Sequence, residues 1–117
     1  MKKSQKTNKA KAIKNRKTKK SNVMPDSITS INSYTFEYWS SLTSITIPSS
    51  VTRIGHHAFC ECRKLTSITC LATTAPILFD YSVFLFAPSS GVLHVPNGSD
   101  YSSWMPKLPN GWVIKYL

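Results

Sequence analysis

The segment from His56 to Cys62 carries two histidines, two cysteines and one glutamate, the side-chain types that hold a tetrahedral zinc ion. Their spacing does not fit such a site. Closed zinc sites usually separate paired cysteines by two to four residues and paired histidines by three to five, whereas these histidines are adjacent and the cysteines form C-x-C. We therefore expect these side chains to lie in the core and at the surface, and we expect no metal site and no cofactor.

Residues for nucleophilic or acid–base catalysis are also poorly arranged. The chain has many serines and three histidines, but no G-x-S-x-G segment and no cysteine and histidine in a recognised order. Its four glycines form no phosphate-binding loop, and its acidic residues are scattered, with no paired carboxylates. The acidic residues are Asp26, Glu37, Glu61, Asp80 and Asp100. The sequence therefore argues against an enzyme.

The positive charge of the chain lies almost entirely at its start. The 117 residues carry a formal charge of +10, and residues 1–20 hold nine lysines and Arg16 with no acidic residue. The other five basic residues are balanced by five acidic ones. The chain thus divides into a cationic leader and a neutral domain of roughly 95 residues.

The leader, residues 1–22, is expected to be disordered because its like charges repel and no apolar stripe compensates for them. Its functional interpretation is non-specific, salt-dependent binding to nucleic acid or an anionic membrane. The basic residues assigned to that role are Lys14, Arg16, Lys17, Lys19 and Lys20. A weak nuclear-import patch, a linker and a spurious start remain open alternatives.

No secretory signal is visible in the leader, because it lacks the apolar run that such a signal needs. No stretch elsewhere reaches the ~18 apolar residues of a membrane span. Cys60, Cys62 and Cys70 are odd in number, which excludes a fully paired disulfide framework and favours a reduced compartment or buried thiols.

A repeat of 23 residues dominates the rest of the chain. Residues 24–46 align with residues 47–69 without a gap, and ten of the 23 positions are identical, including the whole run L-T-S-I-T. A fixed period of this length is typical of a leucine-rich-repeat solenoid.

The apolar spacing predicts how each coil is built. Leu42, Ile45 and Ile47 follow the L-x-x-L-x-L pattern of a turn and a strand, and Leu65, Ile68 and Cys70 repeat it. Alternation along the strand directs Ile45 and Ile47 inward. The predicted binding residues are the outward hydroxyl side chains, side by side in neighbouring coils: Ser44, Thr46, Ser67 and Thr69.

The rest of the coil follows from its turn residues. Pro48 ends the strand because it has no N–H for a ladder, and Val51 and Ile54 supply a second wall. Residues 55–59 are predicted to form one short helical turn that places Phe59 in the interior, stacked on Phe36 of the previous coil.

These residues resemble the BspA-like leucine-rich-repeat family, whose coils read approximately I-P-x-S-V-T-x-I-G-x-x-A-F-x-x-C-x-x-L-T-S-I-T. Residues 47–69 match that pattern almost letter for letter, residues 24–46 more loosely, and residues 70–117 are similar to the C-terminal cap of bacterial members, with a shorter cap helix. The resemblance implies a protein-binding or adhesive module, often at a cell surface and with extracellular-matrix proteins among its partner types.

The two ends of the solenoid raise different expectations. Only the leader precedes the first clear repeat, so the apolar edge of that coil is expected to need a cover, for which Tyr34, Tyr38 and Trp39 are candidates. The alternatives are that the chain is a fragment of a longer repeat array, or that it self-associates edge to edge. At the other end, Asn97–Ser99 is expected to form a turn and residues 111–117 a final strand. Three aromatic residues are expected to seal that end of the core: Trp104, Trp112 and Tyr116.

The sequence therefore predicts a repeat solenoid of the leucine-rich-repeat class, made mainly of short β-strands with brief helical turns. Its parts are the leader (1–22), two repeats (23–69), and a partial repeat with a C-terminal cap (70–117). The predicted function is non-enzymatic binding of a protein or glycan of unknown identity through the hydroxyl-lined sheet. Polyanion binding through the leader is the alternative.

Overall fold

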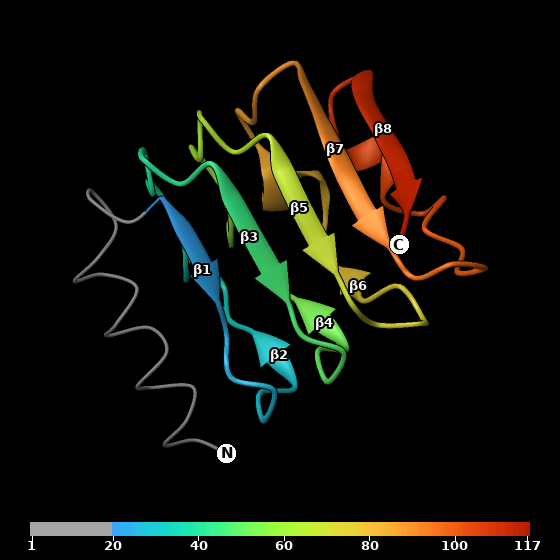
Figure 1. Ribbon diagram of the computed structural model, residues 1–117. Helices are drawn as coiled ribbons and strands as arrows, with labels where there is room; N and C mark the ends of the chain where they lie inside the picture. The colour runs from blue at the N-terminus through green and yellow to red at the C-terminus, as the bar shows by residue number, and fades with distance from the viewer. Residues whose placement is uncertain (1–19) are drawn as a thin grey trace.

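The computed structural model describes residues 20–117 and shows a solenoid of parallel strands (Figure 1). One wall is a five-stranded sheet in the order β1 (Ser21–Val23), β3 (Ser44–Ile47), β5 (Ser67–Cys70), β7 (Ser90–Val95) and β8 (Gly111–Tyr116). A second wall is a three-stranded sheet of β2 (Ser30–Ile31), β4 (Arg53–Ile54) and β6 (Ile77–Leu78). Two short 3-10 helices, η1 (Tyr81–Phe84) and η2 (Met105–Lys107), complete the coils.

Strand register confirms the 23-residue period and shows where it changes. Ser44 lies opposite Ser67, as the repeat predicts. Ser67 in turn lies opposite Val92, so the next coil is 25 residues long. Val92 lies opposite Val113, which makes the last coil 21 residues long. The sheet keeps its parallel pairing through these changes because the extra or missing residues fall in the turns between strands.

The core runs between the two walls as continuous rows of apolar side chains. Ile45 and Ile68 are buried in neighbouring strands of the first wall, and Ile54 is buried in the second, as predicted. The Phe36 and Phe59 rings stack with their centroids 5.3 Å apart and an interplanar angle of 2°. Phe84 continues this stack at 5.5 Å from Phe59, so one aromatic column spans three coils.

The turn after β4 differs from the short helical turn predicted for residues 55–59. Two tight turns follow each other, with the Ala58 N–H donating to the Gly55 carbonyl (3.2 Å) and the Cys60 N–H to the His57 carbonyl (3.2 Å). His57 has a φ of 58°, in the left-handed region that interrupts a right-handed helix.

This turn geometry links neighbouring coils. The Phe36 N–H donates to the Ala58 carbonyl of the next coil at 2.8 Å, and the Phe59 N–H donates to Val83 of the coil after it at 2.9 Å. An α-helix would direct these N–H groups along its own axis. The left-handed residues therefore let the turns pair laterally, much as the strands do.

The first coil is only partly as predicted. Trp39 is buried and packs edge-on against Phe36 at 4.7 Å, whereas Tyr34 and Tyr38 are exposed and do not cover the core. Strand β1 begins at Ser21, so the ordered sheet takes in the last residues of the segment assigned to the leader. The disorder predicted for the remainder of the leader concerns residues 1–19, which lie outside the described residues.

The C-terminal end confirms the turn and the final strand. Gly98 has a φ of 82°, and the Ser99 N–H donates to the Pro96 carbonyl at 3.1 Å, which closes the predicted turn. Trp104 and Trp112 are buried, and each indole N–H donates to a carbonyl at 2.9 Å. Tyr116 was expected to join them but is 57% exposed, because it lies at the last residue of the edge strand β8.

Candidate functional site

The outward side of the five-stranded sheet carries two parallel rows of side chains, which we call the sheet face. It arises because alternate residues of each strand point away from the buried row that contains Ile45 and Ile68. The first row is Ser21, Ser44, Ser67, Val92 and Val113, and the second is Val23, Thr46, Thr69, His94 and Lys115.

The four binding residues predicted from the sequence lie together in the middle of the sheet face. Ser44 is the register partner of Ser67, and Thr46 is the partner of Thr69. All four side chains are partly exposed. Neighbouring strands lie about 4.8 Å apart and alternate residues of one strand about 6.6 Å apart, so the four side chains form a compact rectangle of hydrogen-bond donors and acceptors.

Neighbouring threonines outside the sheet face have a structural role instead. The Thr43 hydroxyl donates to the Lys20 carbonyl and the Thr52 hydroxyl to the Thr29 carbonyl, both at 3.1 Å. Each acceptor lies one coil before its donor. The hydroxyl-rich composition of the repeat thus divides into residues that tie coils together and residues that face outward.

Sequence reasoning predicted four of the ten residues of the sheet face and missed six, among them Ser21 and Val23 on β1. Val92 and His94 on β7, and Val113 and Lys115 on β8, continue the two rows. The surface therefore changes along the solenoid from hydroxyls to aliphatic groups, with an imidazole and an ammonium in the second row. The signal that could have found them is the period-two alternation within residues 90–95 and 111–116.

Of the basic residues assigned to polyanion binding, Lys20 lies within the described part of the chain. It is exposed, and its carbonyl accepts from the Thr43 and Ser44 N–H groups at 2.8 and 3.2 Å. The backbone of Lys20 is thereby fixed beside the start of β3. Four assigned residues lie outside the described residues: Lys14, Arg16, Lys17 and Lys19.

The histidine and cysteine cluster is divided between core and surface. Cys62 is fully buried, its thiol donates to the Phe36 carbonyl at 3.1 Å, and burial raises its pKa to about 12. Cys60 and Cys70 are also buried and free, as expected for unpaired thiols. His56 and His57 are partly exposed against the Tyr34 ring. Within residues 20–117, no group of three or more histidine, cysteine and acidic side chains is placed to hold a metal ion.

Comparison with known proteins yields one match. Residues 4–87 match the family described as "BspA type Leucine rich repeat region (6 copies)". The match ends before β7, so the last two strands of the sheet face lie beyond it. No curated protein and no solved structure matches the chain. In the described part of the chain, none of the helices is long and apolar enough to cross a membrane.

Proposed function

This chain belongs to the BspA-type leucine-rich-repeat family, and on that premise we propose that it is a non-enzymatic binding module whose sheet face contacts a protein or glycan. Solenoids of this kind bind through extended sheet surfaces with regularly spaced side chains. The observation that carries the proposal is the register of Ser44, Thr46, Ser67 and Thr69 at the centre of five parallel strands.

The chemistry of the sheet face favours a hydrogen-bonding ligand. Each hydroxyl can donate one hydrogen bond and accept others, which suits the hydroxyls of a glycan or the backbone of an extended peptide. Lys115 is the one charged side chain in the two rows, and it lies at the edge strand. Binding through the centre of this face should therefore be weak and should depend little on salt.

An adhesive role at a cell surface is part of the same proposal, because the family resemblance implies it. The test is binding of the full chain to immobilised extracellular-matrix proteins and to a glycan array. Thr69→Glu places a charge at the centre of the sheet face and should abolish binding to whichever probe the unaltered chain recognises. The matched control is Thr73→Glu, an exposed threonine in the loop after β5, which should bind normally.

Equal binding by the two variants would contradict a role for the sheet face, and binding to neither class of probe by the unaltered chain would contradict the proposal as a whole. The alternative, polyanion binding through the leader, is separated by a full-length variant with glutamine at positions 14, 16, 17 and 19. If that variant loses RNA or acidic-lipid binding, and the unaltered chain binds these more weakly as salt rises, the leader supplies that activity.

A further inference from the structure

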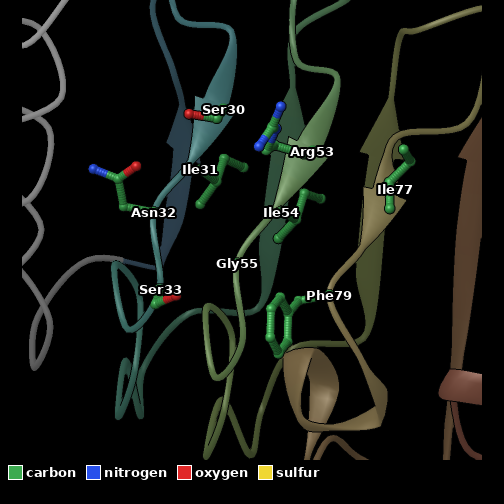
Figure 2. Close-up of a pocket in the computed structure, with 9 residues that line it drawn as sticks. All are labelled: Ser30, Ile31, Asn32, Ser33, Arg53, Ile54, Gly55, Ile77 and Phe79. Carbon is green, nitrogen blue, oxygen red and sulfur yellow. The ribbon is translucent and has the colours of Figure 1, made fainter.

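A second surface lies on a different wall of the solenoid, over the three-stranded sheet. A groove of about 490 Å³ crosses β2, β4 and β6 there, and Figure 2 shows the residues that line it. Its lining residues are Ser30, Ile31, Asn32, Ser33, Arg53, Ile54, Gly55, Ile77 and Phe79. None of the binding residues predicted from the sequence lies in it.

The groove exists because of the residues that three successive coils place at equivalent positions. Ser30, Arg53 and Ile77 are register partners on the outward side of the three short strands. Beyond them, Gly55 has no side chain, and the Phe79 ring extends toward it from the neighbouring coil (Figure 2). Gly55 is itself required by packing, because a Cβ there would lie 2.5 Å from the Ser33 nitrogen.

Large apolar side chains are exposed along this groove. Ile77 is 73% exposed and Phe79 is 66% exposed. Exposed aromatic and aliphatic side chains grouped together commonly mark an interaction surface. The sheet face has no aromatic side chain, so the groove has the anchoring groups that the sheet face lacks.

A cluster of stacked rings continues the groove toward the turns. The His56 ring contacts Phe79 at 5.1 Å and Tyr34 at 5.0 Å, and His57 stacks on Tyr34 at 5.0 Å. Tyr34 and His57 both have left-handed backbones, with φ of 65° and 58°. Residues other than glycine take a positive φ only at an energetic cost. The fold therefore holds these two rings at the surface although the backbone of each residue prefers a negative φ.

The charge of the groove indicates which ligand it suits. Arg53 is exposed and is the one charged residue among those that line the groove. Asp80, which directly follows the lining residue Phe79 in the chain, accepts hydrogen bonds from the backbone N–H and the hydroxyl of Ser82. The guanidinium can therefore form paired hydrogen bonds with an incoming carboxylate beside the exposed Ile77 and Phe79 side chains.

We infer that this groove binds an extended acidic peptide segment in which an apolar side chain lies next to a carboxylate. The apolar side chain lies against the exposed Ile77 and Phe79 side chains, and the carboxylate binds Arg53. Glycans are the less favoured class, because two large exposed side chains of the groove, Ile77 and Phe79, are apolar. The inference is independent of the sheet face, since the two surfaces share no residue.

The probe is a fluorescein-labelled peptide of alternating leucine and glutamate, titrated with the full chain and followed by anisotropy. Two counterparts replace glutamate by glutamine or leucine by serine, and both should bind more weakly. Arg53→Gln should weaken binding of the acidic peptide about tenfold, because it removes charge-assisted hydrogen bonds. Phe79→Ser should weaken it by a similar factor, because it removes the apolar contact.

The matched control is Arg63→Gln, which removes an exposed arginine over Phe86 outside the groove and should leave affinity unchanged. Every variant keeps the cationic leader, so leader-driven attraction is common to all and cancels in the comparison. Equal weakening by Arg53→Gln and Arg63→Gln, or no weakening by either groove variant, would overturn the inference. So would Arg53-dependent binding of an oligouronate with no binding of the peptide. If Arg53→Gln and Phe79→Ser lose peptide binding but keep the binding that Thr69→Glu abolishes, the groove acts separately from the sheet face.

Discussion

Replacing Phe59 by alanine tests whether the aromatic column holds the coils together. The Phe59 side chain is fully buried and lies between two parallel rings, Phe36 at 5.3 Å and Phe84 at 5.5 Å. The substitution removes contacts with both neighbouring coils at once. Because each coil of a solenoid is stabilised by its neighbours, the defect lies at the centre of the molecule and cannot be confined to a fraying end.

The expected loss is large relative to the stability of the domain. Truncation of a buried phenylalanine to alanine costs about 3–5 kcal/mol, and small domains have free energies of unfolding of about 5–15 kcal/mol. For a domain of this size, each kcal/mol lowers the melting temperature by about 4–8 °C. Phe59→Ala should therefore lower the melting temperature by at least about 12 °C, or leave the chain unfolded at room temperature.

Circular dichroism melts of the full chain measure this effect, with Phe79→Ala as the control. Phe79 is 66% exposed, so its truncation should change the free energy of unfolding by no more than about 0.5 kcal/mol. A shift of a degree or two for Phe59→Ala, or equal shifts for the two variants, would refute the aromatic column as a main source of stability.

Three further predictions concern other parts of the coil. The three cysteines should react with a thiol reagent at pH 8 only after denaturation, because they are buried and burial raises the pKa of Cys62 to about 12; fast labelling of the native chain would contradict this. Tyr38 is exposed and has a φ of 63°, so Tyr38→Gly should leave the free energy of unfolding nearly unchanged, whereas Tyr38→Val should lower it by about 1–2 kcal/mol in urea unfolding. Similar free energies of unfolding for the two variants would exclude the left-handed turn. The hydrogen bond from the Ser82 hydroxyl lowers the pKa of Asp80 below its ordinary 3.8. The ionised Asp80 carboxylate therefore stabilises the fold fully above pH 3.8, and this stabilisation is lost as the pH falls through the lowered pKa. Urea midpoints should consequently fall more steeply in acid for the unaltered chain than for Asp80→Asn.

The first two coils could be predicted from the sequence because ten of their 23 positions are identical. Ile45 and Ile68 occupy equivalent positions, and so do Phe36 and Phe59, so both the buried row and the ring stack follow from the period. The outward serines and threonines then follow from alternation along the strand.

The third and fourth coils could not be aligned in the same way. Their lengths differ from the repeat, and register alone shows that Val92 continues the row of Ser67. Sheet pairing requires only an alternation of buried and exposed residues, so Val92 and Val113 can replace serine without any repeated letter.

The turns were mispredicted for a different reason. Left-handed positions are usually recognised by glycine or asparagine, yet tyrosine and histidine occupy them here. β-Branched residues are strongly disfavoured at positive φ, and neither Tyr34 nor His57 is β-branched. This was the one weak sign in the sequence that these positions could be left-handed. The groove beside these turns was missed with them, because Ile77 and Phe79 come from a coil that does not align with the first two without a gap.

The sheet face depends on the parallel register of the five-stranded sheet, and the groove depends on the same stacking of coils through β2, β4 and β6. NMR cross-strand contacts in the five-stranded sheet test that stacking most directly. The account predicts backbone NOEs that connect Thr46 to Thr69, and Thr69 to His94, with the buried partners Ile45, Ile68 and Leu93 connected in the same order. NOEs that pair Thr69 with any other strand, or that run antiparallel, would contradict the solenoid and both surfaces built on it.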